Sequence, residues 1–182
     1  MSDEQLVQFC SPTLAGIKTG NLFSCSYTTK DELFTDLRRL NRILQPKGLR
    51  ILPLKFSGSR VLVYLYRPGD LARDLKAAEA LQLLQEAGYR GRTSEQCIAE
   101  LMRRLKTCDE FPHEIGLFLS YPPEDVRGFM EHRSEAKCTG CWKVYGDADK
   151  AQETFRRYKK CTETYSKQLA GGVPITRLAV AV

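Results

Sequence analysis

The sequence has little of what a membrane, secreted or metal-rich protein needs. Its longest purely apolar run, Val61 to Tyr66, has six residues, whereas a membrane-spanning helix needs about 20. The first residues, Met1 to Gln5, are acidic and lack an apolar core, so they do not form a secretory signal. The chain has only two histidines and a single Cys-x-x-Cys pair. These absences predict a cytoplasmic protein without a membrane segment.

Length and composition are those of an ordinary globular chain. A hydrophobic fraction of 42% and a charged fraction of 27% in 182 residues exclude disordered and low-complexity classes. At roughly 100–200 residues per domain, we expect one domain over residues 1–182. The net charge of +6 is modest, and its basic clusters fall on expected helices. A binding patch needs cations that cluster in space, so the charge does not favour nucleic-acid binding.

Hydrophobic periodicity predicts a mixed α/β chain. A short helix over 3–9 should end at Ser11-Pro12, because proline disfavours helical geometry in the residue before it. The expected longer helices are 31–44, 70–87, 93–106, 123–132 and 147–169. The expected strands are 49–56, 61–66, 115–119 and 142–145, and 175–182 reads as a last strand or a loose tail. This order favours an α+β fold with a mostly antiparallel or mixed sheet of four to five strands covered by helices.

The segment from Cys10 to Cys25 is a candidate ligand-binding loop. It is rich in small and polar residues, and long irregular segments in compact domains are often functional. Small residues let backbone amides approach a ligand, and a lysine can neutralise an anion. The candidate binding residues here are Thr13, Gly16, Lys18 and Asn21, with Cys10 as the candidate catalytic thiol. Residues 15–19 are not a Walker loop, because Ile17 separates the glycine from the lysine. The alternative is a packed loop that covers a sheet edge.

A second candidate lies at Phe111 to Gly116, where one of the two histidines precedes an expected buried strand. His113 is a candidate acid, base or ligand, because its charge changes near neutral pH. Glu114 and Tyr121 are candidate ligand-binding residues at the ends of that strand. The second histidine of a zincin helix is missing, which excludes that metalloprotease type. The alternative for His113 is a hydrogen-bonded structural histidine.

The pair Cys138 and Cys141 suits a redox dithiol or half of a zinc site. Seven cysteines in a chain without an export signal do not indicate a disulfide framework. A zinc site would need two more ligands, available from Cys108, Cys161, His113 and His132. The alternative is a set of unligated thiols.

Three long segments carry a resemblance to a known family. They are residues 10–24 (CSPTLAGIKTGNLFS), 111–129 (FPHEIGLFLSYPPEDVRGF) and 138–145 (CTGCWKVY), with Arg67-Pro68 and residues 158–161 in addition. The chain resembles an uncharacterised bacterial family catalogued as domain of unknown function 3793. Two positions depart from its pattern: Phe9 stands where histidine is expected in many relatives, and Ser120 stands where glycine is usual. The resemblance implies a small cytosolic protein that is encoded near flavodoxin or iron-uptake proteins, which favours a redox or iron-linked accessory role. The family carries no established catalytic residues.

Three hypotheses follow. The leading one is a small-molecule-binding, anion-binding or thiol-redox accessory protein, linked to iron or flavodoxin metabolism. In it, Cys10, Lys18 and His113 line one cleft. The second is a metal-stabilised protein in which Cys138 and Cys141 form half of the site. The third is a non-enzymatic interaction module that docks an acidic partner such as a flavodoxin through basic helix faces.

Overall fold

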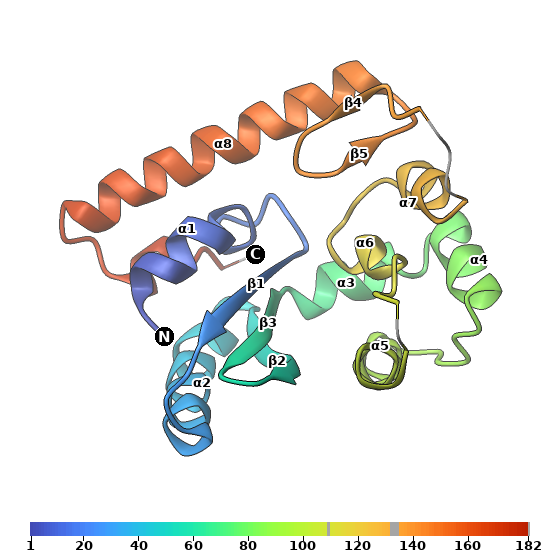
Figure 1. Ribbon diagram of the computed structural model, residues 1–182. Helices are drawn as coiled ribbons and strands as arrows, with labels where there is room; N and C mark the ends of the chain where they lie inside the picture. The colour runs from blue at the N-terminus through green and yellow to red at the C-terminus, as the bar shows by residue number, and fades with distance from the viewer. Residues whose placement is uncertain (109, 132–134, 182) are drawn as a thin grey trace. The chain divides into compact units, whose positions relative to one another are not determined.

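The computed structural model describes residues 1–108, 110–131 and 135–181. The chain divides into two compact units, and Figure 1 shows the elements of each. Unit 1 comprises Met1–Gly69 and Tyr158–Val182, and unit 2 comprises Asp70–Arg157. The single domain expected from the length stays a prediction. No helix within the described ranges combines the length and apolarity that crossing a membrane requires.

Unit 1 contains a three-stranded antiparallel sheet in the order β1-β3-β2. Its elements are α1 (Asp3–Leu14), β1 (Gly20–Ser26), α2 (Lys30–Leu44), the 3-10 helix η1 (Gln45–Lys47), β2 (Arg50–Ser57), β3 (Arg60–Tyr66), the second half of α8 (Ala148–Ala170) and α9 (Ile175–Leu178). The predicted helix over 31–44 and the predicted strands over 49–56 and 61–66 are confirmed, and these two strands, β2 and β3, pair as an antiparallel hairpin. The apolar strand β3 is the central one, and Pro53 lies in an edge strand beside a bulge.

The core of unit 1 lies between the helices and one face of this sheet. Residues two apart on a strand share a face, and those four or three apart on a helix share a stripe. Accordingly, alternate residues of β3 and a leucine stripe of α2 are buried together with residues of α1 and α9. From β3 these residues are Val61, Val63 and Leu65, and from α2 they are Leu33, Leu37, Leu40 and Leu44.

The prediction that the first helix ends at Ser11-Pro12 is wrong. Helix α1 continues to Leu14 with Pro12 inside it. Proline removes one backbone donor and clashes with the preceding turn, but residues 10–14 are all buried. Ser11 also donates its hydroxyl to the carbonyl of Val7 at 2.5 Å. Packing of the last turn of α1 outweighs the preference of Pro12 against helical geometry. The segment expected as a loop from residue 10 is therefore the end of a helix, a turn and strand β1.

Unit 2 is mainly helical. Its elements are α3 (Pro68–Asp74), which begins in unit 1, α4 (Ala78–Glu86), α5 (Ser94–Thr107), α6 (Ile115–Phe118), α7 (Pro123–Met130), the paired strands β4 (Cys138–Thr139) and β5 (Lys143–Val144), and the first half of α8. The predicted helix 93–106 is confirmed as α5, which begins with a capping box: Gln96 N–H donates to Thr93 Oγ1, and Thr93 N–H donates to Gln96 Oε1.

Several expectations for unit 2 and the C-terminal segment need correction. The predicted strand 115–119 is helix α6, because periodicity cannot separate a short apolar strand from a buried helical turn. The predicted helix 70–87 is two helices, α3 and α4, and in α4 Leu83 is buried whereas Leu81 is 42% exposed. The segment expected as a strand or tail contains α9.

The mixed α/β class and its antiparallel pairing are confirmed, but the expected sheet of four to five strands is not. In the described residues the strands form one sheet of three and a separate pair, β4 and β5. The segment 115–119 adds no strand because it is helical. Residues 143 and 144 pair with 139 and 138, and so form a local hairpin.

Candidate functional site

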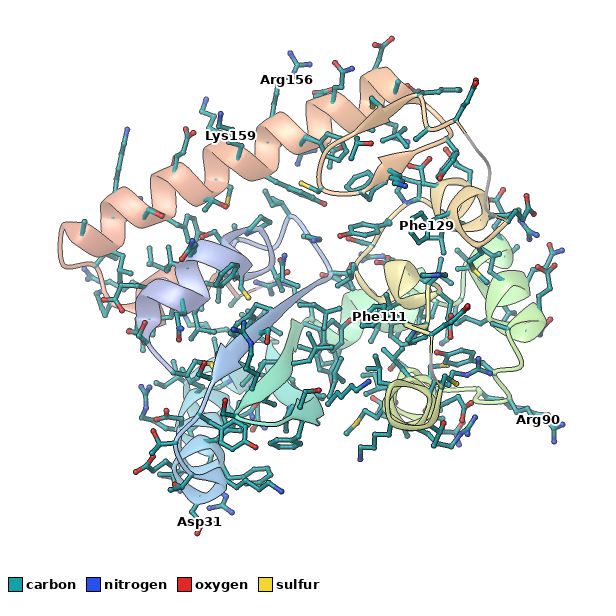
Figure 2. All side chains as sticks on the ribbon, in the orientation of Figure 1. Asp31, Arg90, Phe111, Phe129, Arg156 and Lys159 are labelled. Carbon is teal, nitrogen blue, oxygen red and sulfur yellow. The ribbon has the colours of Figure 1, made fainter. Side chains whose placement is uncertain are left out.

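Unit 2 contains an open, aromatic-lined pocket of about 350 Å³. This volume falls in the range of small-molecule sites, roughly 300–1,000 Å³. The lining comes from the segment before α6, from α6 and α7, and from the β4–β5 hairpin: Phe111, His113, Ile115, Gly116, Tyr121, Asp125, Val126, Phe129, Trp142 and Lys143. Figure 2 labels two of its rings, Phe111 and Phe129. Two predicted site residues, His113 and Tyr121, therefore line the same pocket.

A buried carboxylate attaches the β4–β5 hairpin to α7. Asp125 is 3% exposed. It accepts hydrogen bonds from Trp142 Nε1 at 2.7 Å, from Tyr145 N at 2.6 Å and from Gly146 N at 2.7 Å. A buried carboxylate is stable when donors satisfy its oxygens. From sequence, Asp125 is only an acidic residue in the first turn of a helix, which gives no indication of this role.

The walls of the pocket are aromatic rings in mutual contact. Tyr121 stacks on Trp142 with ring centroids 4.7 Å apart, and its hydroxyl donates to the carbonyl of Cys141 at 3.1 Å. On another wall, the His113 ring meets the Phe129 ring edge-on at 4.8 Å. Lys143 Nζ lies 5.5 Å from the centroid of the Phe129 ring, within cation–π range. The pocket thus presents flat apolar surfaces with two basic side chains, His113 and Lys143.

A glycine permits the close packing of α6 against the pocket wall. A Cβ at Gly116 would lie 2.8 Å from Val126 Cγ2 and 3.1 Å from Tyr121 Cδ2. After α6, Ser120 adopts φ 56°, a left-handed conformation that glycine adopts at the lowest cost. Ser120 directly precedes Tyr121, so this turn directs the Tyr121 ring toward the hairpin.

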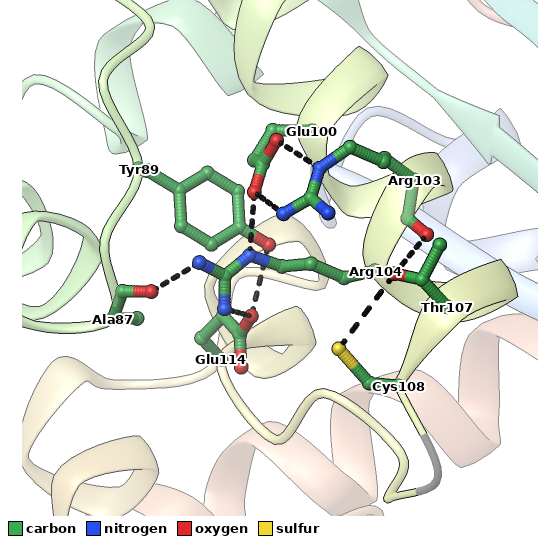
Figure 3. Close-up of polar contacts among 8 residues, drawn as sticks. All are labelled: Ala87, Tyr89, Glu100, Arg103, Arg104, Thr107, Cys108 and Glu114. Atoms are coloured by element: carbon green, nitrogen blue, oxygen red, sulfur yellow. Dashed lines mark hydrogen bonds and ion pairs between the residues drawn. The ribbon is translucent and has the colours of Figure 1, made fainter.

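Glu114 does not line this pocket. Its carboxylate is buried in a polar cluster, where it accepts a hydrogen bond from Tyr89 Oη at 3.0 Å and lies 3.5 Å from Arg104 Nη1 (Figure 3). Arg104 also pairs with Glu100 at 2.9 Å and donates to the carbonyl of Ala87. Burial, followed by the neighbouring Glu114 charge, raises the pKa of Tyr89. The cluster joins α5 to the segment before α6 and places His113.

The predicted loop residues of unit 1 gather around the end of α1. Thr13 Oγ1 donates to Asn21 Oδ1 at 2.7 Å, and Gly16 has φ 75°. Lys18 is 7% exposed, and its Nζ lies 5.5 Å from the centroid of the Tyr158 ring. Cys10 is fully buried. Burial raises the pKa of its thiol, and the charge of Lys18 offsets this only in part. The thiolate that a nucleophile needs is therefore disfavoured.

The expected convergence of Cys10 and Lys18 with His113 stays a prediction. The first two belong to unit 1 and the third belongs to unit 2. What the structure brings together is His113 with Tyr121, and, separately, Thr13 with Asn21.

The family comparison supports one assignment. The chain matches the family described as protein of unknown function (DUF3793) over residues 6–179. It belongs to this family. No curated protein and no solved structure matches the chain. The DUF3793 match spans both units and includes every residue of the pocket.

The Cys-x-x-Cys pair of this DUF3793 chain lies on the hairpin beside the pocket. Cys138 is in β4 and partly exposed, and Cys141 is in the turn and exposed. Neither cysteine forms a disulfide within the described ranges. Among the described residues no group of three or more histidine, cysteine, aspartate or glutamate side chains could hold a metal ion. His132, one of the candidate further ligands, lies outside the described residues. Within the described residues, this pair therefore supplies two of the four ligands that a zinc site would need.

Proposed function

We propose that this DUF3793 protein binds a small planar molecule that carries an acidic group, in the aromatic pocket of unit 2. The observation that carries the proposal is the composition of the pocket: flat rings of Tyr121, Trp142 and Phe129 around about 350 Å³, with His113 and Lys143 among them. Mostly apolar walls with a few polar groups that fix orientation are typical of small-molecule sites. Ring faces favour an aromatic ligand that can stack.

The basic side chains of the pocket indicate that the ligand carries a negative charge. Lys143 is exposed and contacts the Phe129 ring, and it makes no ion pair with a described carboxylate. The one carboxylate among the described lining residues, Asp125, already accepts three hydrogen bonds. An acidic group on the ligand would therefore find a cation available in the pocket, whereas a basic group would find no free acceptor from Asp125.

Trp142 makes binding at this site directly observable, because it is the only tryptophan in the chain. A ¹⁵N-labelled protein gives a single indole N–H signal, from the group that donates to Asp125. We expect 2-naphthoate to bind with saturation in calorimetry and to shift this signal. We expect its neutral analogue 2-naphthamide to bind more weakly, and cyclohexanecarboxylate, which has no aromatic face, to bind weakest.

The matched variants are Lys143→Gln and Lys150→Gln. Lys143→Gln should weaken the binding of 2-naphthoate by about tenfold, which is about 1.4 kcal/mol of binding free energy. The affinity for 2-naphthamide should change little. Lys150 is exposed on α8 and outside the pocket, so its variant should bind like the parent chain. The proposal is wrong if no aromatic acid binds with saturation, or if the indole signal stays in place while binding occurs.

A further inference from the structure

Unit 2 has a second cavity, of about 380 Å³, that the aromatic pocket does not use. It lies between the α3–α4 connection, α4 and the start of α5. Its apolar lining consists of Ala72, Leu75, Leu81, Leu84 and the Tyr89 ring, and its polar lining includes Lys76, Arg90, Arg92, Thr93 and Ser94. The two kinds of lining residue follow the chain: the apolar ones come mainly from the helices, and the charged ones come from the connections. We call this cavity the α4–α5 groove.

The loop before α5 is held flat against that helix. A Cβ at Gly91 would lie 2.8 Å from Gln96 Cβ and 3.2 Å from Cys97 N, so only glycine allows this approach. Cys97 Sγ contacts the carbonyl of Gly91 at 3.8 Å, and Gln96 Oε1 accepts from Arg92 N at 2.8 Å. The loop is therefore fixed by α5, and it places Arg90 and Arg92 on the groove.

The cations of the groove have no ion-pair partner among the described carboxylates. Lys76, Arg90 and Arg92 are exposed, and none of them forms an ion pair with a carboxylate in the described part of the chain. Figure 2 shows the Arg90 side chain extending away from the backbone. Elsewhere in unit 2 several arginines do pair with acids, as Arg103 does with Glu100 at 2.7 Å. Unpaired cations beside an apolar cavity indicate an anionic ligand with an apolar part.

We propose that the α4–α5 groove binds a single-chain phosphate monoester, with its apolar tail against Leu75, Leu81 and Leu84 and its phosphate near Arg90 and Arg92. A phosphate carries up to two negative charges and several acceptor oxygens, which matches three cations and the hydroxyl of Thr93 better than a carboxylate does. The N-terminus of α5, a helix of 14 residues, adds a positive potential at the same end of the groove.

The size of the groove favours a small molecule over a protein segment. An α-helix with side chains is about 10–12 Å across and rises about 5.4 Å per turn, so one turn occupies about 420–610 Å³. The cavity of about 380 Å³ is smaller than this. The same volume lies within the range of small-molecule sites. An acidic peptide is therefore the competing occupant that the test must exclude.

The test uses octyl phosphate on the full chain, below its micelle concentration, with binding followed by calorimetry and by amide signals of residues 92–94. We expect one octyl phosphate to bind per chain, and octanol and inorganic phosphate each to bind at least about tenfold more weakly. The Trp142 indole signal should not move, which separates this site from the aromatic pocket. Failure here would leave the aromatic pocket proposal intact, because that proposal uses another ligand and another signal.

Three variants separate the head and tail contributions. The double variant Arg90→Gln, Arg92→Gln should weaken the binding of octyl phosphate by at least about tenfold. Leu81→Gln should weaken the binding of octyl phosphate several-fold without changing the affinity for inorganic phosphate. Arg156→Gln, at an exposed position of α8 outside the groove, is the control. The proposal is overturned if the control loses as much affinity as the double variant, if octanol binds as well as octyl phosphate, or if an acidic peptide binds more tightly than octyl phosphate.

Discussion

Replacing Arg67 should destabilise unit 1 more than replacing any exposed arginine. Its side chain is buried, and its guanidinium donates to four backbone carbonyls. Nε donates to Thr13 at 2.9 Å, Nη1 to Lys47 at 3.2 Å, and Nη2 to Leu14 at 2.9 Å and to Val180 at 2.8 Å. One planar fork thus joins the end of α1, η1 and the C-terminal segment. No other side chain type has donors in this geometry.

The magnitude follows from what each carbonyl retains in Arg67→Met. The carbonyls of Thr13 and Leu14 keep a second donor, the N–H groups of Gly16 at 3.2 Å and Val180 at 3.0 Å. The carbonyls of Lys47 and Val180 lose a charged donor. Losing a hydrogen bond to a charged group costs about 1.5–3 kcal/mol, and losing one of two bonds costs less. Methionine replaces most of the buried stem, so we expect a total loss of about 3–5 kcal/mol in the free energy of unfolding.

Urea unfolding followed by far-ultraviolet circular dichroism measures this loss. Arg67→Lys should lie between the parent chain and Arg67→Met, because one ammonium cannot serve four divergent carbonyls. Arg50→Met, an exposed position on β2, is the control and should change stability by less than about 0.5 kcal/mol. A loss below about 1 kcal/mol in Arg67→Met would refute the reasoning that these four bonds hold unit 1 together.

Three further predictions concern unit 2. Ser120→Gly should raise the free energy of unfolding by about 0.5–1 kcal/mol, because glycine adopts φ 56° without steric strain; a lower melting temperature would contradict this. Asp125→Ala should cost about 3–4 kcal/mol and shift Trp142 emission to longer wavelength, because three donors lose their acceptor; unchanged emission would show that the hairpin does not depend on it. Hydrogen bonds from Arg103, and then from Arg104, lower the pKa of Glu100 to about 2. The stability from Glu100 is therefore present above the unfolded pKa of about 4.3 and is lost as the pH falls toward 2. In Glu100→Gln the urea midpoint should depend less on pH between these two values than it does in the parent chain. An equal pH dependence in the two chains would contradict this role of Glu100.

The sequence predicted best the elements whose local signals and packing agree. Helix α2 has a leucine stripe along one face, and α5 has a capping box, so both were placed almost to their ends. It failed where packing overrides a local preference. Pro12 should end α1, yet burial of residues 10–14 extends the helix beyond it. In residues 115–118, four apolar or small residues fit a strand or a helical turn equally well, and only contact with the rest of unit 2 decides between them.

The candidate site shows why a motif can be found without its geometry. His113 and Tyr121 are recognisable because a rare residue and a proline-rich turn flank a short apolar run. Asp125, Phe129 and Lys143 carry no such signal, since an acid, a ring and a lysine at those positions are each ordinary in a helix or a strand. They become one site because Asp125 binds the hairpin through three donors, which brings Lys143 over the Phe129 ring. That contact joins residues 14 positions apart in the chain, and no local periodicity encodes it. The two segments that carry the family resemblance, 111–129 and 138–145, are thus better understood as two halves of one pocket than as two separate motifs.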